Sequence, residues 1–158
     1  DIFNNLVVEL GKIGLHRYEI SNFAKDGYQS FHNKKYWEGE GYIAFGMSGS
    51  GYLSNYRYTN TRNFIHYNDK INNHILPIDD YNYIDKNERE IEYIIFKLRE
   101  SSGINLAEFK KKFGHDFLEK YKKEIERFAN QDFFIIDQDF KFSQKGMNLS
   151  NEFLRLII

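Results

Sequence analysis

The feature that most constrains the fold is a run of capped amphipathic segments in the second half of the chain. Asp85 followed by Glu88 is typical of a capping box that starts a helix. Apolar residues then recur at helical spacing, at Ile91, Ile94, Ile95 and Leu98. Asn105 and Gly114 mark the cap and the stop of a second helix. These signals predict a helical domain in which each helix buries one apolar face.

The rest of that half predicts a hairpin and a further helix. A third helix is expected where apolar residues recur at Phe117, Tyr121, Ile125 and Phe128. The run "FFIIDQDFKF" at 133–142 has two β-rich halves around polar residues, which is typical of a hairpin. Ser143 then caps a final helix. Helices, a hairpin and another helix in this order favour a winged-helix-like domain.

The first half of the chain has a different texture. A first helical face is formed by the apolar residues Ile2, Leu6, Leu10 and Ile13. Gly14 stops this helix, and the alternating run "LHRYEISNFA" at 15–24 predicts a strand. A helix, a glycine and a strand in succession are half of a βαβ unit.

Shorter elements are expected after that strand. Residues 25–41 read as a long polar loop, and "YIAF" at 42–45 as a short buried strand. Residues 61–71 show a helical pattern. Residues 72–85, which contain the single proline, are expected to form a linker.

The composition excludes several classes of site. Of the 158 residues, 41% are hydrophobic, and the formal net charge of −1 argues against a dedicated nucleic-acid binder or a polybasic membrane anchor. The absence of cysteine excludes disulfides, thiolate zinc sites, covalent c-type heme attachment and a self-contained iron–sulfur cluster. No apolar run of about 18 residues occurs, so no transmembrane helix is expected.

The start of the chain adds two expectations. The sequence does not begin with Met and opens inside an amphipathic pattern, so we expect it to be part of a larger protein. No signal peptide is visible, and we expect a cytoplasmic location.

Two motifs have a functional and a structural interpretation. The run "GMSGSG" at 46–51 could cradle a phosphate, but it lacks the Gly-Lys-Ser/Thr of a Walker loop and the following helix of a Rossmann fingerprint. A tight turn is the favoured interpretation. The lysines at 110–112, 120, 122 and 123, together with Arg127, are interleaved with glutamates, which is typical of a solvated helix face and not of a DNA-reading one.

The stretch "HNKKYW" at 32–37 joins a histidine to the only tryptophan. On the residues alone, His32 is more simply a solvated or hydrogen-bonded side chain than a ligand of a metal or a heme. Trp37 is more simply a packing residue. The histidines show no His-x-x-x-His spacing of a metal site.

Three motifs taken in order resemble one family. "GLHRYEISNFAKDG", then "SFHNKKYW", then "YIAFGMSGSGYL" with "RYTN" resemble the oxygen-independent coproporphyrinogen III oxidase-like family of radical-SAM proteins. The His-Asn-x-x-Tyr-Trp motif is similar to the heme-chaperone branch, more than to the true decarboxylating oxidases. The resemblance begins near residue 10 and reaches the end, where "LSNEFLRLI" is similar to the small C-terminal domain of the family.

The resemblance implies an α+β fold, with the end of an incomplete radical-SAM α/β barrel followed by the winged-helix-like domain. Residues 1–75 are then expected to hold the last part of the barrel and a crossing segment, and 76–158 the C-terminal domain. The family binds a 4Fe–4S cluster and S-adenosylmethionine through an N-terminal CxxxCxxC motif and a glycine-rich segment, and neither is present here. The parent protein is expected to bind both cofactors, and this part alone to be inactive.

The resemblance also implies a heme or porphyrin site at the mouth of the barrel, where α/β barrels place their functional loops. The implied residues are Ser21, Asn22, His32, Asn33, Tyr36 and Trp37. His32 would ligate the heme iron and Asn33 would orient it, while the two aromatic residues would pack against the macrocycle or the barrel. In the structural alternative, His32 and Asn33 hydrogen-bond the loop and the aromatic side chains belong to the core.

The glycine-rich run departs from the family pattern. Ala44 stands where the family has Gly, and Gly49, Ser50 and Gly51 stand where Ala-x-Ser is common. For that reason only proximity of the backbone to a cofactor is carried over, through Gly46 and Ser48.

Three functions follow as hypotheses. The first is heme binding and delivery by a radical-SAM protein of heme metabolism, with a heme-accepting protein as a partner. The second is anaerobic oxidative decarboxylation of coproporphyrinogen III by the parent enzyme. The third belongs to another functional class and is a winged-helix module that binds protein or nucleic acid. The balanced charge argues against a nucleic-acid partner.

Overall fold

The structure, a computed structural model, describes residues 2–158. Its contacts form two compact units: Gly39–Arg89 is one, and the chain up to Glu38 together with Glu90–Ile158 is the other. Each unit is described by itself. The division into domains at 1–75 and 76–158 stays a prediction. The two compact units have other boundaries than these predicted domains. Within residues 2–158, no helix has both the length and the apolar character needed to cross a membrane.

The capped helices of the second half are confirmed. Helix α4 (Lys86–Arg99) begins with a capping box, in which the Asp85 carboxylate accepts the Glu88 N–H and the Glu88 carboxylate accepts the Asp85 N–H, both at 2.9 Å. Helix α5 (Leu106–Phe113) is capped by Asn105 and ends at Gly114, whose φ is 88°. The third predicted helix is broken at its middle into α6 (Phe117–Lys120) and α7 (Lys122–Glu126).

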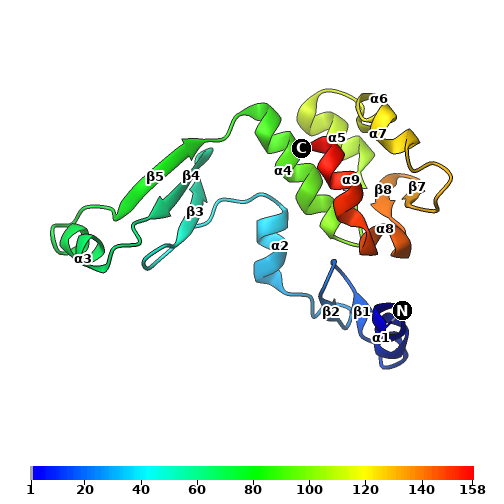
Figure 1. The fold of residues 1–158 in the computed structure, drawn as a ribbon, viewed down its shortest axis with the longest axis horizontal. Helices are drawn as coiled ribbons and strands as arrows, with labels where there is room; N and C mark the ends of the chain where they lie inside the picture. Colours follow the sequence, from blue (N-terminus) through cyan, green and yellow to red (C-terminus); the bar gives the residue numbers. More distant parts are fainter. Residues whose placement is uncertain (1) are drawn as a thin grey trace. The chain divides into compact units, whose positions relative to one another are not determined.

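The predicted hairpin at 133–142 is also confirmed, and it belongs to a small sheet. Strands β7 (Phe134–Ile136) and β8 (Asp139–Phe142) pair antiparallel, and β6 (Ile104–Asn105) joins β8 on its other edge. Ser143 caps α8 (Gln144–Asn148), and α9 (Ser150–Ile157) follows. Figure 1 shows α4, α5 and α9 gathered beside this sheet. The arrangement is winged-helix-like, and the α+β class is confirmed.

Phenylalanine dominates the core of this helical part. The five largest side chains that are almost wholly removed from solvent are Phe109, Phe117, Phe133, Phe140 and Phe153. Their rings meet neighbouring rings at tilted or edge-on angles, which is the preferred geometry of aromatic pairs. Burying each such side chain stabilises the fold by about 1.5–3 kcal/mol. Packing therefore explains why this part of the chain is rich in phenylalanine.

One charged side chain lies inside this domain. Glu90 of α4 is only 2% exposed, and its Oε1 atom accepts hydrogen bonds from three donors at 2.8–3.0 Å. The donors are His115, Lys120 and Tyr121. Burial alone would raise the pKa of the Glu90 carboxyl, but the hydrogen bonds outweigh burial and lower this pKa. We call these four residues the Glu90 cluster; it fixes α4 to α6 and to the start of α7.

The N-terminal part of the same unit differs from the expectation. It contains α1 (Ile2–Lys12), β1 (His16–Arg17), β2 (Phe23–Ala24) and α2 (Phe31–Trp37). The predicted continuous strand at 15–24 is wrong, because β1 and β2 fold back on each other as an antiparallel pair. The predicted loop at 25–41 is also wrong in part, since α2 lies within it.

Polar hydrogen bonds explain why the strand is broken. The buried Glu19 carboxylate accepts the backbone N–H and the hydroxyl of Ser21 at 2.8 and 3.0 Å. The Tyr18 N–H donates to the Asn22 carbonyl at 3.1 Å and closes the turn. Local side-chain bonds of this kind compete with a regular strand.

The second unit is a three-stranded antiparallel sheet with one helix. Strands β3 (Ser50–Leu53), β4 (Tyr56–Asn60) and β5 (Ile78–Tyr83) lie in that order, and α3 (Phe64–Asn72) connects β4 to β5. In Figure 1, α3 lies beyond the end of the sheet where β4 stops and β5 begins. The helix predicted at 61–71 is confirmed.

Two expectations for this unit are wrong. The predicted linker at 72–85 contains β5, whose pairing with β4 sets its conformation. The predicted buried strand at 42–45 forms only a single bridge, between Tyr42 and Tyr52, and Phe45 is 88% exposed. An apolar run is therefore a poor guide to a strand where its side chains stay on the surface.

The Glu90 cluster gives a first test. Glu90→Gln is expected to lower the free energy of unfolding at neutral pH by about 1.5–3 kcal/mol, the range for hydrogen bonds to a charged group. Because the folded-state pKa is lowered, the wild-type contribution is present above the ordinary pKa of glutamate. It is lost as the pH falls through the lowered value. Denaturant unfolding at neutral and acidic pH measures both effects.

The matched control for this test is Glu126→Gln, which removes a carboxylate that is 61% exposed and 3.8 Å from Lys122. Exposed pairs of this kind contribute at most about 1 kcal/mol. If both substitutions have the same effect at neutral pH, the structural role of the Glu90 cluster is contradicted.

Candidate functional site

The stretch "HNKKYW" lies on α2, a helix of seven residues. Ser30 caps the helix, with its hydroxyl accepting the Asn33 N–H at 3.3 Å, and the Glu38 N–H donates to the Lys34 carbonyl at its end. The sequence analysis missed this helix because seven residues are too few to show a helical apolar period. The serine cap was the signal that could have revealed it.

One side of α2 presents an imidazole to the solvent. His32 is exposed, and its ring meets the Tyr36 ring edge-on at 4.8 Å between centroids. The two residues are four apart and therefore share a helix face. Beside them, Phe31 is 73% exposed and lies 5.1 Å from the Lys35 ammonium. This side combines a metal-binding nitrogen with aromatic surface and positive charge.

The other side of α2 is anchored. Trp37 is 9% exposed and lies 6.1 Å from the ring of Tyr18, at an interplanar angle of 51°. Trp37 lies five positions after His32, so their side chains leave the helix about 140° apart. The structure thus buries Trp37 and exposes His32, while Tyr36 is half-buried.

These residues fit heme better than a metal ion held by protein groups alone. No cluster of three or more His, Cys, Asp or Glu side chains that could hold a metal occurs among residues 2–158. A heme needs one imidazole, because the porphyrin supplies the four equatorial nitrogens of the iron. In the described part of the chain, the His32 imidazole has no hydrogen-bond partner, and apolar ring surface lies next to it. A single exposed imidazole beside apolar ring surface is therefore suited to bind a heme iron as an axial ligand.

Ser21 and Asn22 lie in the turn between β1 and β2. The Ser21 hydroxyl binds the Glu19 carboxylate, and the Asn22 carbonyl accepts from Tyr18. Both side chains are exposed, in the same compact unit as α2. Their predicted contact with a porphyrin stays a prediction.

Gly46 and Ser48 belong to the other unit and use their backbone groups within it. The Gly46 N–H donates to the Tyr67 hydroxyl at 3.2 Å, and its carbonyl accepts from the Asn60 amide at 2.9 Å. The Ser48 N–H donates to the Thr61 carbonyl at 3.2 Å. With φ values of 86° and 58°, the two residues form a tight turn. Their N–H groups are thus engaged by this chain, which favours the tight-turn interpretation over a phosphate cradle.

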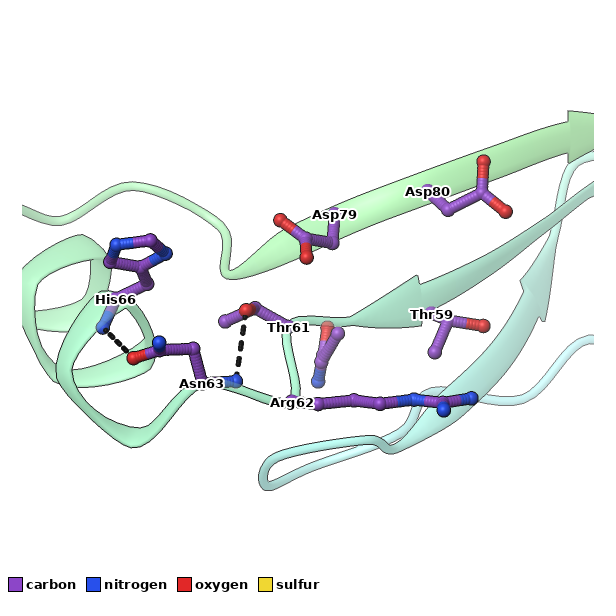
Figure 2. A pocket seen from close by; sticks show the side chains of 8 residues that line it. Thr59, Thr61, Arg62, Asn63, His66, Asp79 and Asp80 are labelled. Atoms are coloured by element: carbon purple, nitrogen blue, oxygen red, sulfur yellow. Dashed lines mark hydrogen bonds between the residues drawn. The ribbon is translucent and has the colours of Figure 1, made fainter.

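A polar cavity of about 360 Å³ lies at the start of α3 (Figure 2). Asn63 occupies the helix N-terminus, where its side chain accepts the N–H groups of Ile65 and His66. Asp79 and Asp80 bring negative charge to the same cavity, as Figure 2 shows. An anion would therefore meet carboxylates, and the amides that usually bind it are already paired.

An apolar cavity of about 430 Å³ lies on one face of the sheet in the same unit. Its most exposed apolar residues are Ile43, Phe45, Leu53 and Leu76. The polar groups at its rim are paired, since the hydroxyls of Tyr58 and Tyr67 accept from the backbone of Ala44 and Gly46. Most of the residues that line the cavity are apolar.

The two sides of α2 can be told apart by substitution. Trp37→Ala is expected to lower the free energy of unfolding by about 3 kcal/mol, because it removes a buried aromatic side chain. Phe31→Ala is the matched control and should change it by less than about 0.5 kcal/mol. Circular dichroism in denaturant measures stability, and hydrogen exchange over residues 30–37 locates the change. Equal effects of the two substitutions would contradict the assignment of the sides.

Comparison with known proteins gives the same family as the motifs. The model of the HemN C-terminal domain matches residues 84–149. Heme chaperone HemW of Lactococcus lactis is 32% identical over 96% of this chain and 40% of its own length. HemW of Bacillus subtilis is 38% identical over 64% of this chain and 27% of its own length. The chain thus spans less than half of the relatives that it matches.

A solved structure shares the fold. The coproporphyrinogen III oxidase HemN of Escherichia coli, described as a radical-SAM enzyme, matches 99% of this chain and 40% of its own chain with a TM-score of 0.77. At 10% identity this likeness concerns the fold alone. The resemblance inferred from the three motifs is confirmed. Residues 84–149 match the HemN C-terminal domain, and the chain is similar over nearly its whole length to part of a heme chaperone HemW.

Proposed function

We propose that this chain forms the heme-handling part of a HemW-like heme chaperone, with His32 as the axial ligand of the heme iron. The observation that carries the proposal is the orientation of α2, which exposes His32 next to the half-buried Tyr36 while Trp37 is buried on the other side. The relatives named heme chaperone HemW support the same function.

The residues of α2 divide the work of binding. His32 supplies the nitrogen that coordinates iron, and Tyr36 limits the rotation of the imidazole by its edge-on contact at 4.8 Å. Phe31 offers apolar surface to the macrocycle, and Lys35 offers a positive charge to the porphyrin carboxylates. Asn33 is half-buried, and its N–H holds the helix start to Ser30. Bound heme would bring the metal; this chain binds, orients and releases it.

The proposal extends to the full-length protein. It would carry a 4Fe–4S cluster and S-adenosylmethionine, with cluster ligands supplied by residues outside these 158, because this sequence has no cysteine. A second protein would accept the heme. Ser21 and Asn22 are proposed to border the heme, and Gly46 and Ser48 to bring backbone close to a cofactor in the complete fold.

A hemin titration of the full-length gene product tests the proposed function. His32→Ala is expected to weaken hemin binding by about tenfold or more and to shift the Soret band, since the axial nitrogen is lost. His66→Ala, which removes an exposed imidazole of α3, is the control and should leave both unchanged. An unaltered Soret band and affinity in His32→Ala would refute the proposal. Formation of decarboxylated product from coproporphyrinogen III would favour the oxidase instead.

A further inference from the structure

Tyr18 contacts both ends of α2. Its hydroxyl accepts the N–H of Ser30, the N-cap of the helix, at 3.4 Å. Its ring packs against Trp37, the last residue of the helix, at 6.1 Å. The first contact is long and therefore weak, so the aromatic pair provides most of the attraction. One side chain thus contacts both ends of the helix.

The backbone of Tyr18 is in turn attached to the C-terminal domain. Its carbonyl accepts from the N–H of Ser101 at 3.1 Å and from the Ser101 hydroxyl at 3.4 Å. Glu19, the next residue, forms a β-bridge with Glu100. Both of these partners follow α4 and lie within the HemN C-terminal domain. The C-terminal domain therefore binds the backbone of Tyr18, and the Tyr18 side chain contacts α2.

A helix as short as α2 has no stable orientation of its own. Isolated helices shorter than about 12 residues are marginal in water. Among the described residues of α2, Trp37 is the one that is buried. The direction in which His32 points consequently depends on the Trp37–Tyr18 contact.

We infer that Tyr18 is a positioning residue for heme, which orients His32 through α2 and ties this orientation to the HemN C-terminal domain. The inference rests on the proposed function and adds a role for the C-terminal domain in heme binding. Tyr18 itself does not touch the iron; it acts through Trp37 and Ser30. Loss of the ring should therefore disturb the geometry of the His32–iron bond.

The test compares two substitutions in the full-length gene product. Tyr18→Leu removes the ring and is expected to weaken hemin binding by about tenfold, with a shifted and broadened Soret band. Tyr18→Phe keeps the ring and should restore the affinity and the band. It should still let the Ser30 amide exchange about threefold faster, because the weak hydrogen bond is lost. The Soret shift reports iron ligation, which a change in stability alone does not move.

A matched control separates positioning from general destabilisation. Phe128→Leu also removes an aromatic ring, in this case a buried one from the aromatic core beside Phe133 and Phe153. It should lower stability and leave the Soret band in place. An unchanged Soret band and affinity in Tyr18→Leu, while His32→Ala loses both, would overturn the inference alone. If His32→Ala is also silent, the proposed function fails instead. If Tyr18→Leu does not fold, an unchanged Ser30 exchange rate in Tyr18→Phe would overturn the inference.

Discussion

The contact between Tyr18 and Trp37 is the interaction on which the candidate site depends. It is modest in itself, one aromatic pair at 6.1 Å, but it joins two short segments. The helix on one side has seven residues, and the turn on the other side is held by the Glu19 carboxylate and by Ser101. Because both are short, a single buried ring decides which side of the helix faces outward.

That outward side explains why one motif combines such different residues. A heme ligand must be accessible, whereas the helix that carries it must be attached to something rigid. His32 and Trp37 meet these demands on opposite sides of α2. Two other polar regions lack this chemistry: the cavity near α3 mixes carboxylates with paired amides, and the lysines of α5 to α7 have acidic neighbours such as Asp116 and Glu126. Neither favours a nucleic-acid partner.

The sequence was most informative where structure is encoded locally. The cap at Asp85, the stop at Gly114 and the hairpin at 133–142 were predicted because backbone groups and short-range side chains decide them. Strand β5 was missed because its side chains are mostly exposed, and its conformation comes from pairing with β4. The helix α2 was missed because its seven residues are too few to show a helical apolar period. The motif pointed to His32 as a candidate site residue. It gave no sign that Tyr18 contacts the helix that carries His32.

The most direct measurement of the central claim uses Trp37 as a probe, since it is the only tryptophan of these 158 residues. Hemin is titrated into the chain while tryptophan emission and the Soret band are recorded together. If α2 carries the heme, the emission should be quenched in step with one-to-one binding, and His32→Ala should remove the quenching and the Soret change together. Emission that stays unquenched when the Soret band shows saturation would place the heme elsewhere and contradict the account.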